Sequence, residues 1–180
     1  MPLYALGGDR PRIHPDAFVH PEAVLIGEVC LGAHASVWPA VVIRADNGPI
    51  VVGPRTSIQD GTVIHTRPED PTRIGADCVI GHLVHLEGCV LEDFVLVGSG
   101  AVVLDRAVCR SPSLVAAGAV VSPGTEVPAG AMAVGIPARI RDGRVTETLV
   151  AGNVEAYLRH VVQHREGSRP IALEDCIEVQ

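Results

Sequence analysis

The stretch GHLVHLEGC, residues 81–89, brings His82, His85 and Glu87 close together in the chain. Imidazole nitrogens and carboxylate oxygens are common ligands of divalent metals such as zinc. The chain has no G-x-S-x-G motif, P-loop or Rossmann fingerprint that would indicate other chemistry. Whether these side chains bind a metal or decorate a surface depends on which residues stack above one another in space.

The elements that must position these residues follow a six-residue period. Apolar residues recur every six positions, with extra residues after Ile43 and Ile64 and a step of five after Leu86. Except at the breaks in spacing, a small or β-branched residue follows each of these apolar residues by four positions, as Ala23 and Thr62 do. The recurring positions are Ile13, Val19, Leu25, Leu31, Val37, Ile43, Val52, Ile58, Ile64, Ile74, Ile80, Leu86, Leu91, Val97, Val103, Cys109, Val115, Val121 and Val127.

A period of six with one aliphatic and one small position is typical of the hexapeptide repeat of a parallel β-helix. The aliphatic side chains stack into a core and the small residues fit the corners. A β-sandwich would not keep this period over most of the chain. We therefore predict an all-β solenoid over residues 1–144, a C-terminal α-helix over 145–167 that packs on the solenoid, and a tail over 168–180.

Counting hexads around the triangular turn assigns each outward side chain to a face. Arg44, His65 and Glu87 each follow a core residue of the same face in successive turns. They should therefore form one outward column, with rungs about 4.8 Å apart as in any sheet. Their neighbours in the column, Ile26 and Leu104, are apolar. This face is therefore predicted to carry a polar cluster only in its middle.

His82 follows a core residue of a different face, at the height of residues 59–60. It cannot easily join His65 and Glu87 within one chain. A three-fold trimer that packs one face of a chain against another face of the next would bring them together. Apolar outward residues on these faces, Trp38 among them, favour such packing.

Two segments of the chain, SVWPAVVIRADNGPIVVGPRTSIQDGTVIH and IGADCVIGHLVHLEGCVLEDFVLVGSGAVVL, carry a family resemblance. Over about residues 10–165 the chain resembles the γ-class carbonic anhydrases and their bacterial relatives, which have a left-handed parallel β-helix. The resemblance implies a homotrimer with a divalent metal, usually zinc, between subunits. The family's ligand positions correspond to His65, His82 and Glu87, and the third ligand is a histidine in the family.

Four further positions match family motifs. Arg44 and Asp46 match an R-x-D motif that links subunits and orients the site, and Gln59 and Asp60 match a Q-D pair. The resemblance places Gln59 near the metal-bound water. It implies hydration of carbon dioxide to bicarbonate by metal-bound hydroxide, with Zn²⁺ or another divalent ion such as Fe²⁺, Co²⁺ or Ni²⁺.

Glu87 departs from the family pattern. Two histidines and one glutamate are a known catalytic zinc set that leaves a position open for water. An anionic third ligand would lower the net charge of the metal and make its bound water less acidic. Alternatively, His82 and Glu87 form a metal-free ion pair across the interface. His85 is then either a surface histidine or a replacement for Glu87 as ligand.

Other functions also fit the predicted fold. Hexapeptide solenoids often carry acyltransferase or thioesterase activity, and VGIPARIR, residues 134–141, resembles the segment that closes the solenoid of such acetyltransferases. Those transferases usually carry a catalytic histidine on a protruding loop, and the inserted segment RPEDPT before Ile74 contains none. A non-catalytic trimer that binds a metal is a further possibility, because fold alone does not determine activity.

The composition of the chain indicates which binding partners and which cellular compartment to expect. The formal net charge of -7 argues against a nucleic-acid or membrane-surface partner. We see no signal peptide and no apolar run long enough to span a bilayer, which predicts a cytoplasmic protein. The 5 cysteines include no C-x-x-C pair, so reduced, mostly buried thiols are expected.

Overall fold

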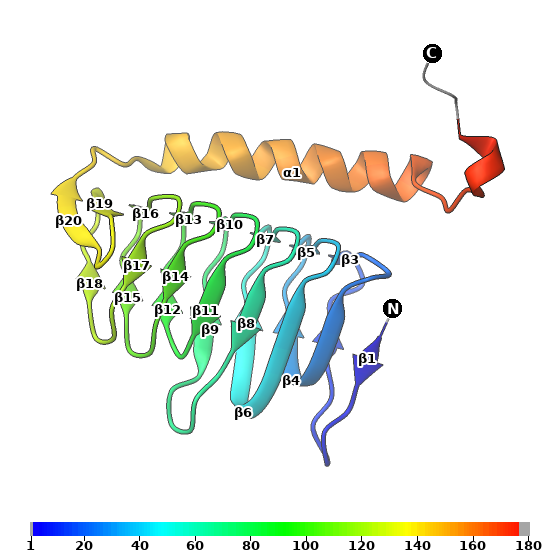
Figure 1. Ribbon diagram of the computed structural model, residues 1–180, viewed down its shortest axis with the longest axis horizontal. Helices are drawn as coiled ribbons and strands as arrows, with labels where there is room; N and C mark the ends of the chain where they lie inside the picture. Colours follow the sequence, from blue (N-terminus) through cyan, green and yellow to red (C-terminus); the bar gives the residue numbers. More distant parts are fainter. Residues whose placement is uncertain (1, 177–180) are drawn as a thin grey trace.

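The computed structural model describes residues 2–176 and consists of a parallel β-solenoid with a long helix along its side (Figure 1). The predicted fold class is therefore confirmed. Every recurring apolar position from Leu25 to Val127 is buried in one continuous core. Ile13 and Val19, in the first turn, are partly buried and pack against the end of that core.

The strands of the described residues form two sheets. The 12-stranded sheet contains β1 (Leu3–Tyr4), β2 (Arg12–Ile13), β4 (Val24–Leu31), β6 (Val42–Val52), β8 (Val63–His65), β9 (Thr72–Ile74), β11 (His85–Glu87), β12 (Val90–Leu91), β14 (Val102–Val103), β15 (Val108–Cys109), β17 (Val120–Val121) and β18 (Glu126–Val127). The 8-stranded sheet contains β3 (Phe18–Val19), β5 (Ser36–Val37), β7 (Ser57–Ile58), β10 (Val79–Ile80), β13 (Val95–Val97), β16 (Ser113–Val115), β19 (Ala131–Val134) and β20 (Arg139–Asp142). Only β20 pairs antiparallel to its neighbour among these strands, and it closes the C-terminal end of the solenoid.

The larger sheet covers two faces of the triangle because β4 and β6 run through the corner between them, where their pairing shifts register. The breaks in the six-residue spacing all fall at this corner. The extra residues after Ile64 form a loop between β8 and β9 that projects from the solenoid (Figure 1). Each break directly follows one residue of the predicted polar column.

Gly88 makes the shortened step at this corner possible. Its φ of +60° lies in the left-handed region, and a Cβ atom there would approach the Cβ atoms of Asp70 and Asp105 to 3.0 and 3.2 Å. A side chain is therefore disfavoured both by the backbone conformation and by the space available. Only Gly88 and Cys89 separate β11 from β12.

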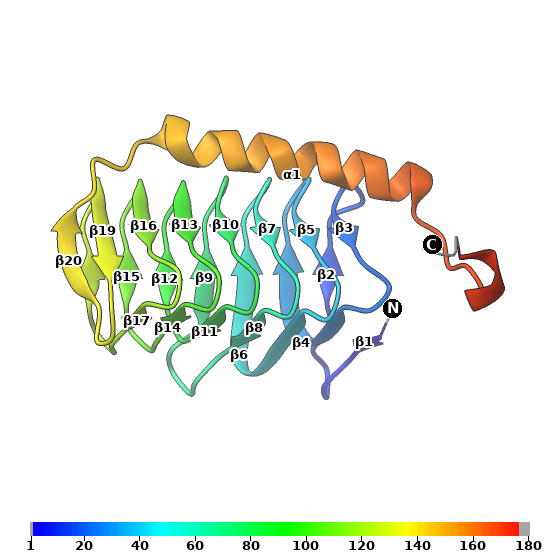
Figure 2. The same ribbon diagram turned by 45° about the horizontal axis from the view of Figure 1, so that its top comes forward.

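The helix α1 (Glu147–Gly167) lies along the 8-stranded sheet in both views (Figure 2). Its N-cap is Thr146, whose hydroxyl accepts a hydrogen bond from the backbone N–H of Leu149 at 3.3 Å. Val150 and Val154 are buried against Val79 of the sheet. A short 3₁₀ turn, η1 (Leu173–Asp175), follows the helix. No helix of residues 2–176 is both long and apolar enough to cross a bilayer.

The buried cysteines belong to the solenoid core. Cys78, Cys89 and Cys109 are buried, Cys30 is half-buried, and all the cysteines are free. Removal from water raises the pKa of Cys78 and that of Cys89 to about 12. These thiols therefore stay protonated near neutral pH, which makes them packing groups rather than nucleophiles or metal ligands.

Candidate metal site

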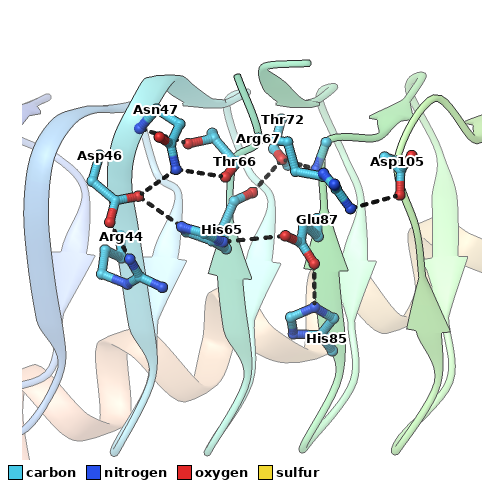
Figure 3. A network of polar contacts seen from close by, with 11 residues as sticks. Arg44, Asp46, Asn47, His65, Thr66, Arg67, Thr72, His85, Glu87 and Asp105 are labelled. Carbon is cyan, nitrogen blue, oxygen red and sulfur yellow. Dashed lines mark hydrogen bonds and ion pairs between the residues drawn. The ribbon is translucent and has the colours of Figure 1, made fainter. Parts of the chain in front are cut away.

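Arg44, His65 and Glu87 form the predicted outward column on consecutive strands. The register pairs Arg44 of β6 with His65 of β8, and His65 with Glu87 of β11. Nδ1 of His65 lies 3.4 Å from Oε1 of Glu87 (Figure 3). The sheet thus presents an imidazole and a carboxylate side by side.

Asp46 fixes the ring of His65 from the other side. Its Oδ1 accepts a 2.7 Å hydrogen bond from Nε2 of His65, and its Oδ2 forms a close ion pair with Arg44 (Figure 3). Burial acts to raise the pKa of Asp46, but the hydrogen bond from His65 and the charge of Arg44 outweigh it and lower that pKa. The carboxylate is therefore ionised near neutral pH, and it holds a proton on Nε2 of His65.

The middle of β6 supports Asp46 in turn. Nδ2 of Asn47 donates to Oδ1 of Asp46 at 3.2 Å and to the backbone oxygen of Thr66 at 3.3 Å. The backbone N–H of Asn47 donates to the hydroxyl of Thr66 at 3.2 Å. These bonds connect the part of β6 after Arg44 to the loop after His65 (Figure 3). Sequence reasoning did not single out Asn47 or Thr66.

Thr72, which is fully buried, connects the two strands that carry the imidazole and the carboxylate. Its hydroxyl donates to the backbone oxygen of His65 at 2.6 Å and accepts from the backbone N–H of Gly88 at 2.9 Å. One side chain therefore satisfies backbone groups at the ends of both β8 and β11. These bonds reinforce the direct pairing of β8 with β11, which places His65 beside Glu87.

Glu87 lies between two imidazoles of its own chain. Its Oε1 faces His65, and its Oε2 lies 3.3 Å from Nε2 of His85 (Figure 3). Burial acts to raise the pKa of Glu87, but the hydrogen bonds to His85 and His65 outweigh it and lower that pKa. Glu87 is therefore an anion near neutral pH.

His82 lies apart from this column, at the end of β10 in the smaller sheet. Its Nδ1 is 3.0 Å from Oδ2 of Asp60, and both side chains are about half exposed. Since a carboxylate can only accept, the proton lies on Nδ1 and leaves Nε2 as a free acceptor. Among residues 2–176, no group of three or more His, Cys, Asp or Glu side chains could hold a metal ion.

Gln59, which the family resemblance places near the metal-bound water, is buried, with 4% of its surface exposed. Its neighbour Asp60 faces Tyr157 of α1. Burial raises the pKa of the Tyr157 phenol, and the negative charge of Asp60 raises it further. The helix thus contributes Tyr157 to the surroundings of the His82–Asp60 pair. Nothing in the sequence pattern distinguished Tyr157 from a packing residue.

Trp38 does not belong to an open apolar surface. It is 4% exposed, because Tyr157 and His164 of α1 cover it, with ring centroids 5.6 and 5.0 Å from the indole. The indole N–H donates to the hydroxyls of Ser36 and Ser57. The prediction that Trp38 belongs to an apolar surface for subunit packing is therefore wrong, since its partner is the chain's own helix.

Comparison with known proteins identifies the family. The carnitine operon protein CaiE of Salmonella agona is 39% identical over 140 residues, which cover 78% of this chain and 71% of that protein. This chain belongs to the hexapeptide-repeat family of CaiE and the γ carbonic anhydrases. No protein-family profile matches the chain.

Two further members of the comparison place the chain within this hexapeptide-repeat family. The mitochondrial γ carbonic anhydrase 2 of Arabidopsis thaliana is 37% identical over 146 residues, which cover 78% of this chain and 52% of that protein. The chain thus spans about half the length of this plant relative. The crystal structure of a hexapeptide transferase family protein from Anaplasma phagocytophilum superposes with a TM-score of 0.85 at 35% identity, covering 91% of this chain and 98% of that one.

Proposed function

We propose that the chain forms a homotrimer that holds a divalent metal between subunits and hydrates carbon dioxide. The ligands would be His65 and Glu87 of one subunit and His82 of its neighbour. One observation carries this proposal. Nε2 of His65 donates to Asp46, and Nδ1 of the same ring lies 3.4 Å from the anionic Oε1 of Glu87. In a neutral ring this Nδ1 would be an acceptor facing another acceptor, so the contact is favourable only with a cation between the two atoms, either a second proton on His65 or a metal ion.

The donor set fits a divalent metal. Histidines that bind metals usually donate their other ring N–H to a carboxylate, which fixes the tautomer and the ring orientation. His65 has this partner in Asp46 at 2.7 Å, and His82 has it in Asp60 at 3.0 Å. Each predicted histidine ligand is therefore prepared by an aspartate of its own chain. His82 requires a second subunit, because it lies on the other sheet.

The remaining residues would shape the chemistry. A divalent ion supplies acidity to a coordinated water, whose pKa it lowers towards about 7. Glu87 would reduce the charge of that ion, so we expect a higher working pH than for three neutral ligands. Gln59 would orient the water through its carboxamide. Arg44 would place its guanidinium, 45% exposed in one chain, across the subunit boundary.

A column of outward valines beside the polar column supports assembly. These outward residues alternate with core residues and stand in register on β4, β6, β8, β14 and β17, with β11 between β8 and β14, and Val63 is 39% exposed. We call them the valine column: Val24, Val42, Val63, Val102 and Val120. A flat face of β-branched side chains next to charged residues suits a subunit interface with an apolar centre.

Complementation between two inactive variants tests the shared site. His65→Ala and His82→Ala would each abolish metal binding in homotrimers. When the two are unfolded and reassembled together, about one site in four would combine an intact His65 with an intact His82 from different subunits. We expect metal content and stopped-flow hydration of carbon dioxide to recover to that fraction, at trimer mass by light scattering. No recovery in mixed trimers, or a monomer mass for the parent, would contradict the proposal.

Acyl transfer is the second candidate, because the Anaplasma phagocytophilum structure of 35% identity is described as a hexapeptide transferase family protein. The β8–β9 loop of this chain carries no histidine, which argues against it. Release of free thiol from acetyl-coenzyme A in the presence of amine or alcohol acceptors would favour this function. Metal uptake without hydration would indicate a non-catalytic metal-binding trimer.

A further inference from the structure

His85 interrupts the valine column. In register it pairs with Val63 on one side and Val102 on the other, and the residue after it, Leu86, is buried. The position therefore faces outward and is valine in the strands on either side. An imidazole there has no packing advantage over valine on a pleated surface. A polar contact would therefore account for a histidine at this position.

The structure shows what His85 contacts. It stands two residues before Glu87 on β11, so both side chains leave the same face of the strand. Nε2 of His85 lies 3.3 Å from Oε2 of Glu87, while Oε1 of Glu87 faces His65 at 3.4 Å. Since Oε2 can only accept, His85 donates from Nε2. The two oxygens of one carboxylate are thus assigned to different histidines (Figure 3).

We infer that His85 is a positioning residue that fixes the Glu87 carboxylate as a metal ligand, an inference that rests on the proposed function. An imidazole ligand has a rigid ring with one donor atom. A glutamate ligand has two equivalent oxygens on a terminal torsion with a broad energy profile. A hydrogen bond to Oε2 restricts this torsion and keeps Oε1 directed at His65. Metal-binding carboxylates are commonly held by such outer hydrogen bonds.

Titration of the metal-free protein with Co²⁺, followed by its visible absorption, tests this role. His85→Val restores the residue type of the column and should fold, but it removes the donor. We expect it to weaken Co²⁺ binding roughly 10–100-fold, with unchanged stoichiometry and band positions. His85→Gln keeps an N–H donor and should recover most of the affinity. Val108→Thr, at an outward valine of β15 outside the valine column, is the matched control and should bind like the parent.

Two results would overturn the inference. Unchanged Co²⁺ affinity in His85→Val would show that the contact with Glu87 has no role in binding. Displaced absorption bands in His85→Val, with no recovery in His85→Gln, would show that His85 is itself a ligand in place of a positioning residue.

A metal-free measurement separates this inference from the proposed function. Side-chain ¹⁵N spectra should show His85 with its proton on Nε2, and this preference should be lost in Glu87→Ala. If the parent takes up no Co²⁺ while His85 behaves in this way, the metal site fails and the positioning of Glu87 by His85 is supported. A proton on Nδ1 of His85 in the parent would overturn the inference, whatever the metal content.

Discussion

The hydroxyl of Thr72 donates a 2.6 Å hydrogen bond to the backbone oxygen of His65, and it does so from a fully buried position. The hydroxyl oxygen of Thr72 in turn accepts a hydrogen bond from the backbone N–H of Gly88, next to Glu87. Thr56 makes the same pair of bonds elsewhere in the solenoid, donating to the oxygen of Gly75 at 2.7 Å and accepting from the N–H of Cys78 at 3.0 Å. The chain therefore contains a matched control for the threonine that spans the candidate site.

Thr72→Val keeps the side-chain shape and removes both hydrogen bonds. Because the N–H of Gly88 loses its partner, we expect the free energy of unfolding to fall by about 1–3 kcal/mol, with a similar loss in Thr56→Val. Only Thr72→Val should weaken Zn²⁺ binding, because Thr72 bonds to the backbone beside both His65 and Glu87, whereas Thr56 bonds to neither strand of the site. Urea unfolding and Zn²⁺ titration measure the two effects. Equal Zn²⁺ affinities in the two variants would contradict this role of Thr72.

Arg44→Ala should weaken assembly more than it disturbs the solenoid. Arg44 points outward, so its loss leaves the aliphatic core intact, and it removes a planar group suited to paired hydrogen bonds across an interface. Analytical ultracentrifugation should show dissociation at concentrations ~10-fold higher or more than for the parent. Arg12→Ala, which breaks the exposed pair with Glu28, is the control and should stay assembled. A trimer as stable as the parent would assign Arg44 another role.

Glu87→His should create a site of three neutral ligands. More positive charge then remains on the metal, so its water ionises more easily and the pH midpoint of hydration moves down. Zn²⁺ per subunit, measured after identical purification, should rise or stay full in Glu87→His and fall in Glu87→Ala. Full occupancy in Glu87→Ala would show that Glu87 is not a required ligand, and would direct attention to His85.

Glu92 offers a test of electrostatics away from the site. Hydrogen bonds from Arg110 and from the backbone N–H of Ser111 lower the pKa of Glu92 in the folded chain. A depressed pKa adds stability above the unfolded value of 4.5, and this contribution disappears as the pH falls through the folded value. Since Glu92 is partly exposed, Glu92→Gln should cost roughly 1 kcal/mol or less at pH 7.

The test measures the free energy of unfolding in urea for the parent and for Glu92→Gln, at neutral and at strongly acidic pH. The difference between them should be present at neutral pH and close to zero in acid. A difference that grows as the pH falls would show that the ion pair with Arg110 does not set the titration of Glu92.

The sequence predicted the solenoid because a core made of stacked side chains imposes its period directly on the chain. The same counting placed Arg44, His65 and Glu87 in one column, and the register agrees. It misplaced Trp38, since the position of a helix that docks from the chain terminus is not encoded in the repeat. It did not single out Asn47, Thr66 and Thr72, because they lie in the inserted residues, where the six-residue spacing no longer assigns a side chain to a position.

The bonds at the two ends of α1 have a consequence for how the chain unfolds. In a solenoid each turn contacts only its neighbours, so an open stack can fray from either end independently. Here the backbone N–H of Val145 bonds to the oxygen of Gly130, and Arg165 bonds to the oxygens of Asp16 and Ala17 at the opposite end. If the first turn frays, the C-terminal end of α1 therefore loses its bonds to Asp16 and Ala17, while its N-terminal end stays bonded beside the last turn. The helix thus couples the two ends of the solenoid, so unfolding of one end is expected to weaken the contacts that hold the other.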